Sequence, residues 1–294
     1  GGSLGQMGMA IRSLLAKQRP NLPAGVRIAI TSKELASALE SKKRQSISAA
    51  AAVLASSALS GRVPDAVILG TVDESGAFKM PTGFWDQLQA LGKGTGQRLV
   101  LPAEAAAVLP SMLALEKPGF FMEYEVLLAA DFKQLAEFSA KTPEGPLANA
   151  TKEFRLIRER AGNQDVRQYI ANTFVKQRLG AVYQEAPAHF SAKMLLIQAA
   201  GNRPTLVAKT VLASELRRAL EPMVWLVKFQ NDGSEIEETS KIGQTYELCR
   251  ARVDGLERYA EKNDRSLLDH ARELVIAIRN LDRATRTRGE NYVV

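Results

Sequence analysis

Residues 42–62 read KKRQSISAAAAVLASSALSGR, and residues 66–72, which follow almost at once, read AVILGTV. The Ala-rich stretch from Ser46 to Leu59 has the composition of a helix that lies against a sheet, and Gly61 is well placed to end it. The second run is apolar and predicts a buried strand. A helix followed directly by a buried strand is the repeating unit of α/β domains.

The same alternation of helix and strand continues on both sides of this unit. Strands are expected at residues 26–31, 66–72, 98–101 and 124–129, and helices at 7–17, 46–59, 103–115 and 132–138, with a short helix that starts near Gly83. Pro20 and Pro23 end the first of these helices, and a Gly-containing turn at residues 74–76 follows the second strand. This order predicts an α/β domain whose strands are joined by crossover helices.

The apolar pattern changes near residue 145, and this change marks the expected domain boundary. Residues 141–147 (KTPEGPL) read as a linker, and beyond it the pattern is almost wholly helical, with its clearest break at residues 231–233 (NDG). A chain of 294 residues exceeds the size of one ordinary core, so two domains are expected. We therefore expect an α/β domain at residues 1–145 and an all-α helical bundle domain at residues 146–294.

The positive charge of the chain is spread thinly. The 39 Lys and Arg residues exceed the 32 Asp and Glu residues, which gives a net charge of +7. The sequence has no dense basic block with interleaved aromatic residues, so we interpret the excess as diluted surface charge and do not expect a nucleic-acid partner. No apolar run is long enough to cross a bilayer, so a membrane partner is not expected either.

Few residues of this chain suit metal or triad chemistry. Cys249 is the only cysteine, and His189 and His270 are the only histidines, so we expect no internal disulfide, no metal site and no cofactor. His189 follows Pro187 in a loop and His270 lies inside a helical segment, so neither is expected to serve a Ser-His-Asp triad. The sequence also lacks the Gly-rich signatures of dinucleotide and ATP sites. It begins Gly-Gly-Ser, which reads as a trimmed or processed end, and we expect a cytoplasmic location with export left open.

Motifs spaced along the first half of the chain point to a known family. In order they are LGQMGM (4–9), VRIAIT (26–31), SALSGR (57–62), Gly70, Gly76, LVLPAEAAAVLP (99–110) and YEVLLAADFKQLAEF (124–138). This series resembles the proteolytic domain of Lon protease over about residues 4–140. The resemblance implies a Lon-type α/β fold and protein or peptide partners. Because that family assembles its proteolytic domains into rings, it also implies a homo-oligomer.

The Lon family uses a Ser-Lys dyad, in which a buried lysine takes the proton of a serine hydroxyl. By this resemblance, Ser46 falls on the nucleophilic serine and Gln87 falls on the position of the lysine. Gln87 follows MPTGF (80–84), which stands where the family has a Pro-x-Gly-Gly-Leu turn. Glutamine cannot act as a general base near neutral pH, so the dyad is expected to be incomplete.

The residues leave two roles open for Ser46. As a helix N-cap, its hydroxyl would accept hydrogen bonds from backbone N–H groups at the start of the Ala-rich helix. As a nucleophile, it would need Lys79, Lys42 or Lys43 as its base, and Lys79 is the candidate. We expect a non-catalytic scaffold or binding module, and the alternative is a serine endopeptidase that pairs Ser46 with Lys79. A nucleic-acid-associated module is a third hypothesis, suggested only by the basic pI of about 9.5.

Overall fold

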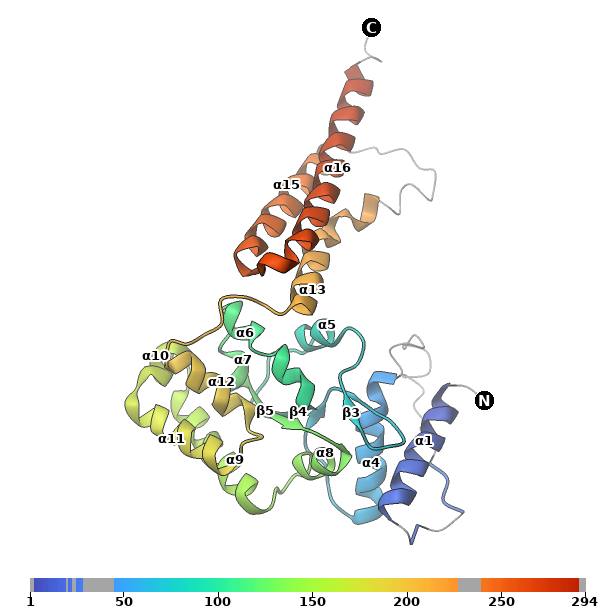
Figure 1. The fold of residues 1–294 in the computed structure, drawn as a ribbon, viewed down its shortest axis with the longest axis vertical. Coiled ribbons are helices and arrows are strands. Elements are labelled where there is room, and N and C mark those ends of the chain that lie inside the picture. Colours follow the sequence, from blue (N-terminus) through green and yellow to red (C-terminus); the bar gives the residue numbers. More distant parts are fainter. Residues whose placement is uncertain (1–2, 20, 23–24, 29–44, 227–238, 291–294) are drawn as a thin grey trace. The chain divides into compact units, whose positions relative to one another are not determined.

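The structure is a computed structural model that describes residues 3–19, 21–22, 25–28, 45–226 and 239–290. The chain divides into two compact units, residues 1–203, here called the sheet unit, and residues 204–294, here called the helical unit. The sheet unit contains a small parallel sheet with many helices, and the described part of the helical unit contains helices alone (Figure 1). The expected class, mixed α/β followed by helices, is therefore confirmed in outline.

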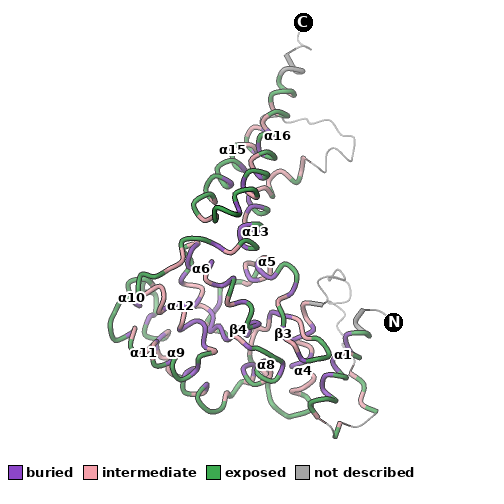
Figure 2. Tube along the Cα trace, in the orientation of Figure 1, coloured by how far each residue is buried: buried purple, intermediate pink, exposed green. Residues whose placement is uncertain are grey.

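Three parallel strands form the main sheet. They are β1 (Val67–Ile68), β4 (Gln97–Pro102) and β5 (Tyr124–Ala129), in the spatial order β1-β4-β5. In register, Leu99 lies opposite Val126. β4 and β5 are buried along most of their length, as is typical of parallel strands (Figure 2). The strands expected at residues 98–101 and 124–129 are confirmed.

The run AVILGTV, expected as one strand, forms two. After β1 the chain turns at Gly70 into β2 (Thr71–Val72), which pairs with β3 (Phe78–Lys79) in an antiparallel hairpin. Gly70 lies so close to the ring of Phe78 that an added Cβ atom would be 2.2 Å from it. Gly76 makes the turn of the hairpin with a φ of 87°, a left-handed conformation that favours glycine.

Three helices form a connected layer beside these strands. α1 (Ser3–Gln18) packs on α4 (Ser48–Ser60), α4 contacts α8 (Phe132–Phe138) and β2, and α8 contacts β5. α4 ends at Gly61, which has a φ of 70°, as the sequence predicts. Ala49 and Ala52 are fully buried, so the small side chains of the Ala-rich run let this helix approach its neighbours closely.

Two predicted elements differ from the structure. The helix expected at residues 103–115 is divided into the 3-10 helix η2 (Ala103–Ala107) and the short helix α6 (Ser111–Ala114), because Pro110 cannot donate the N–H that a continuous helix would use. Of the strand expected at residues 26–31, residues 26–28 carry no strand and the rest lie outside the described residues. The remaining short helices of this region are α5 (Phe84–Gln89) and α7 (Phe120–Glu123).

Four further helices belong to the sheet unit and not to a separate domain that begins at residue 146. They are α9 (Gly145–Ala161), α10 (Val166–Ala171), α11 (Thr173–Glu185) and α12 (Phe190–Ala199). α11 packs on α9 and α12, and α12 packs on β5. The division into compact units falls after Arg203, whereas the sequence pattern placed it near 145. The change in the apolar pattern near residue 145 therefore does not mark the end of the sheet unit.

The segment before α12 also lies along the outer edge of β5. The N–H of Leu128 donates to the carbonyl of Ala188 at 3.0 Å. The hydroxyl of Ser191 donates to the carbonyl of Tyr124 and accepts from the N–H of Val126, both at 2.8 Å. These contacts join residues 60 or more positions apart and fix the helical layer to the sheet.

The helical unit is built on α13 (Lys209–Leu220), α15 (Thr239–Leu256) and α16 (Arg265–Glu290). Its buried seam is apolar and comprises Val211, Leu212, Ile242, Cys249, Val253, Leu268, Val275 and Ile278. Burial raises the pKa of the Cys249 thiol. The break expected at residues 231–233 lies outside the described residues. None of the helices in the described residues combines the length and apolarity that a membrane crossing needs.

Candidate functional site

Ser46 lies in a 3-10 turn that precedes α4. The turn is η1 (Gln45–Ile47), α4 begins at Ser48, and the residue at the N-cap position is Ile47. Ser46 is therefore one residue too early to be the N-cap that the sequence suggested. A different serine ties the start of the helix to the hairpin, since the buried Ser48 hydroxyl accepts from the N–H of Val72 at 3.0 Å.

Lys79, the candidate base, lies on the hairpin strand β3. β3 pairs with β2, which contacts the turn that carries Ser46, so the hairpin and the turn are neighbours. The Lys79 ammonium nitrogen lies 3.5 Å from a carboxylate oxygen of Asp73, and 62% of its side chain is exposed. A lysine that serves as a base needs an apolar, water-poor setting, and this one faces water and a carboxylate. Lys42 and Lys43 lie outside the described residues.

Gln87, which the resemblance alone would place at the lysine of a dyad, takes part in local structure. It lies in α5, and its side-chain amide donates to the carbonyl of Thr82 at 3.0 Å. This bond closes the turn at Gly83, whose φ of 69° starts the helix. Phe84 and Trp85 are buried beside it. The side chain thus stabilises the entry to α5 and supplies no proton acceptor of useful basicity.

A buried charged cluster lies between the sheet and the helical layer, and the sequence did not reveal it. Arg98 on β4 and Glu125 on β5 are opposite each other in register, with the Arg98 Nε 3.7 Å from a Glu125 carboxylate oxygen. The Nε2 of His189 lies 3.2 Å from the other oxygen of Glu125. Arg98 also donates to the carbonyls of Phe138 and Ala140, at 3.0 and 2.7 Å. We call the side chains of Arg98, Glu125 and His189 the buried charge cluster.

The hydrogen bonds of His189 define its role. Its Nδ1 accepts from the N–H of Ala192 at 3.2 Å, so the proton is on Nε2 and is donated to Glu125. His189 is fully buried, and its side chain caps α12. The neighbouring hydroxyl of Ser191 is bonded to the β5 backbone at both its donor and acceptor sites. Both ring nitrogens of His189 are thus engaged inside the protein, one by Glu125 and the other by Ala192.

Burial works to raise the pKa of Glu125. The hydrogen bond from His189 and the positive charge of Arg98 outweigh burial, so the pKa lies below its ordinary value of 4.5. The carboxylate is therefore held ionised at the base of the helical layer. Arg158 of α9 is a second cation near Glu125, and its guanidinium lies 5.5 Å from the centre of the Phe154 ring. Burial lowers the pKa of this guanidinium.

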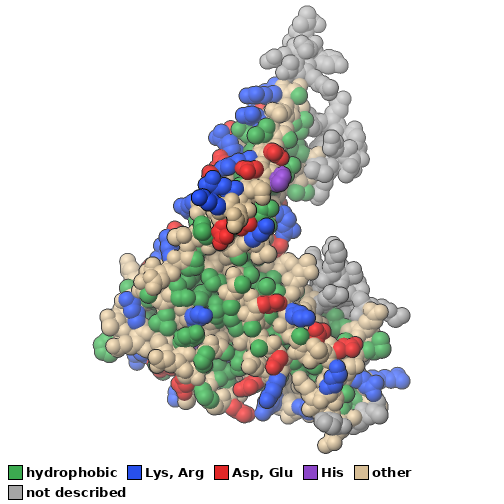
Figure 3. Space-filling view, viewed as in Figure 1, with side chains coloured by type: hydrophobic (Ala, Val, Ile, Leu, Met, Phe, Trp, Pro, Cys, Tyr) green, Lys and Arg blue, Asp and Glu red, His purple; other side chains and the backbone are tan. Residues whose placement is uncertain are grey.

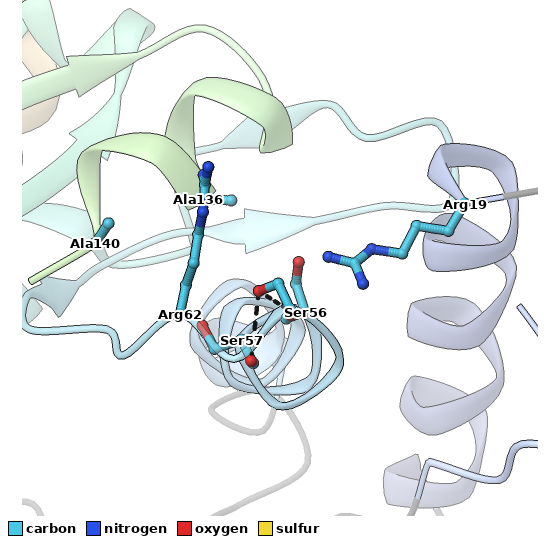
Figure 4. A pocket seen from close by; sticks show the side chains of 7 residues that line it. Arg19, Ser56, Ser57, Arg62, Ala136 and Ala140 are labelled. Carbon is cyan, nitrogen blue, oxygen red and sulfur yellow. Dashed lines mark hydrogen bonds between the residues drawn. The ribbon is translucent and has the colours of Figure 1, made fainter. Parts of the chain in front are cut away.

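A groove lies at the other end of α4 from Ser46 (Figure 4). It has a volume of about 540 Å³ and is lined by Arg19, Ser56, Ser57, Ser60, Arg62, Ala136 and Ala140. We call it the arginine–serine groove. Arg19 donates to the carbonyl of Leu59 at 2.9 Å, and Arg62 lies 3.5 Å from a carboxylate oxygen of Glu144.

A second, mainly apolar pocket of about 290 Å³ lies between α5, α6 and α7. Leu88, Met112 and Phe120 line it, together with the ring of Tyr124, whose hydroxyl donates to the carbonyl of Gly92 at 2.8 Å. Apolar walls with a few polar groups are typical of sites that accept a side chain or small molecule.

Within the described ranges, no group of three or more His, Cys, Asp or Glu side chains could hold a metal ion. On the face shown in Figure 3, basic and acidic side chains are interspersed. Comparison with protein-family models, with curated proteins and with solved structures finds no match for this chain.

Proposed function

We propose that the sheet unit is a Lon-type proteolytic domain that lacks Ser-Lys chemistry and serves as a scaffold or binding module for protein or peptide. The observation that carries this proposal is the setting of Gln87 and of Lys79, the candidate base. Gln87 is bonded to the Thr82 carbonyl, and Lys79 is exposed beside Asp73. A serine hydroxyl is a weak nucleophile unless a neighbouring base takes its proton.

Two features support binding without catalysis. The apolar pocket between α5, α6 and α7 offers a hollow for an apolar side chain. The resemblance to a ring-forming family favours self-association, in which neighbouring copies of the sheet unit would present such hollows repeatedly. A cytoplasmic location belongs to the same proposal.

The test of activity is digestion of an unstructured protein by the purified chain. The parent, Ser46→Ala and Lys79→Ala are incubated with reduced, carboxymethylated substrate, and cleavage is followed by mass spectrometry. A fluorophosphonate probe, which labels activated serines, is applied in parallel. We expect no cleavage beyond that of the Ser46→Ala variant, and no labelling of Ser46.

The second candidate function is a serine endopeptidase that uses Ser46 and Lys79. It is favoured by the packing of β2 against the turn of Ser46, which brings the hairpin of Lys79 to the same end of α4. Cleavage that disappears in both Ser46→Ala and Lys79→Ala, with folding preserved by circular dichroism, would establish it and remove the first proposal. Light scattering of the full chain tests assembly, and a strictly monomeric mass contradicts the ring scaffold.

A further inference from the structure

The arginine–serine groove is built by residues of α4 and α8 and by residues that follow the ends of α1, α4 and α8. Arg19 follows the end of α1 and reaches toward Ser56, while Arg62 extends beside Ala136 of α8 (Figure 4). Ala136 lies on α8 and Ala140 lies just after the end of that helix, so the wall opposite the serines consists of methyl groups. Small side chains on this wall leave the volume of about 540 Å³ open.

The groove has more hydrogen-bond donors than its own contacts use. Arg19 donates one N–H to the carbonyl of Leu59, although a guanidinium carries five. The hydroxyls of Ser56 and Ser57 make no hydrogen bond within the described residues, and both side chains are half-buried. Two cationic groups and two hydroxyls therefore face a common space.

Acidic groups do little to neutralise these cations. Glu144 approaches Arg62 at 3.5 Å, but the two side chains are 58% (Arg62) and 77% (Glu144) exposed, which marks a weak, water-screened pair. The C-terminal end of α4 carries a partial negative charge that would oppose an anion. Arg19 offsets this effect, because its N–H already occupies the terminal carbonyl of Leu59.

We propose that the arginine–serine groove binds a small molecule through a phosphate group. Paired guanidinium groups suit the tetrahedral array of phosphate oxygens, and serine hydroxyls can donate to the same oxygens. The volume lies within the range of about 300–1,000 Å³ that small-molecule sites occupy, so an organic phosphate fills the groove better than the bare ion. Binding here requires neither Ser46 nor peptidase chemistry, so this proposal stands apart from the proposed function.

The experiment measures binding of three probes to the full chain by calorimetry at low salt: inorganic phosphate, adenosine monophosphate and adenosine. Both phosphates are expected to bind, the nucleotide more tightly, and adenosine is expected not to bind. Equal affinity for the two phosphates also supports the site and assigns it to the free ion. Binding of adenosine as tight as that of its monophosphate, or no binding of either phosphate, overturns the proposal.

Matched variants locate the site. Arg19→Gln combined with Arg62→Gln should weaken phosphate binding at least about tenfold, because two charge-assisted hydrogen bonds are lost. Arg155→Gln removes an equally exposed arginine that is paired with Glu159, and should leave affinity unchanged. Because Arg19 also caps α4, Ala136→Glu provides a second test that keeps both arginines, with Ala136→Gln as its neutral control. Ala136→Glu should bind phosphate more weakly than Ala136→Gln. Equal phosphate binding by these two variants contradicts the assignment. Equal phosphate binding by the parent and the double arginine variant contradicts it as well.

Discussion

The sheet unit holds two sets of opposite charges in opposite environments. In the buried charge cluster, Arg98 and Glu125 are almost inaccessible, at 8% and 3% exposure. On the hairpin beside Ser46, the side chains of Lys79 and Asp73 are 62% and 48% exposed to water. Water can replace a lost partner on the hairpin but not in the cluster. Burial, more than the presence of a partner, therefore decides which charges stabilise the fold. Lys79, the only candidate base among the described residues near Ser46, is too exposed to act as a base.

Glu125→Ala should give the largest effect, because it leaves Arg98 buried without its counter-charge. We expect a loss of about 3–5 kcal/mol in the free energy of unfolding. Urea denaturation in a Trp225→Phe background checks this, since Trp85 then reports on the sheet unit alone. A loss below about 1 kcal/mol would mean that the cluster is as well solvated as the hairpin pair.

The buried carboxylate also predicts a pH dependence. The pKa of Glu125 is lower in the folded chain than its ordinary value of 4.5, so its contribution to stability is present above pH 4.5 and is lost as pH falls through the folded pKa. The stability difference between the parent and Glu125→Gln should therefore shrink below pH 4.5. A difference that stays constant from pH 7 to pH 3 (roughly, the window in which carboxyl groups titrate) would contradict the assigned direction.

An intermediate effect is expected where α4 meets the hairpin. Ser48→Ala leaves the N–H of Val72 without its acceptor, which should cost about 1–3 kcal/mol. Ser56→Ala is the matched control in the same helix, because its hydroxyl makes no hydrogen bond within the described residues. Equal stability of the two variants would show that the contact between Ser48 and the hairpin carries little free energy.

The smallest change is expected on the hairpin itself. Lys79→Ala removes an exposed ion pair and should change the free energy of unfolding by no more than about 1 kcal/mol. Thermal denaturation at low and high salt measures the effect, and the small difference should fade as salt screens the pair. A loss as large as that of Glu125→Ala would erase the distinction between the two sets of charges.

Apolar runs in the sequence predict individual strands and helices. They do not predict the contacts that depend on how neighbouring strands are aligned. The strands at residues 98–101 and 124–129 were predicted from apolar runs, but Arg98 and Glu125 each read as a polar residue near a strand end. Their pairing depends on the register between β4 and β5, which no pattern within a single strand predicts. The split of AVILGTV at Gly70 is not local either, because it depends on the ring of Phe78.

The groove and the extent of the sheet unit show the same limit. SALSGR was noted as a motif, but Arg19 lies 40 residues before the carbonyl that it binds, and no local pattern predicts that distance. Likewise, the amphipathic pattern of α9 and α12 predicts helices without naming β5 as the surface on which α12 packs.

The backbone contacts between β5 and residues 188–191 bear on how this protein can be cut into pieces. A fragment that stops at residue 145 would strip the bonds from the N–H groups of Val126 and Leu128 and from the carbonyl of Tyr124. An uncovered strand edge of this kind recruits other chains and promotes aggregation. Truncation after Arg203 keeps that edge sheltered and gives the shorter piece suited to biochemical work.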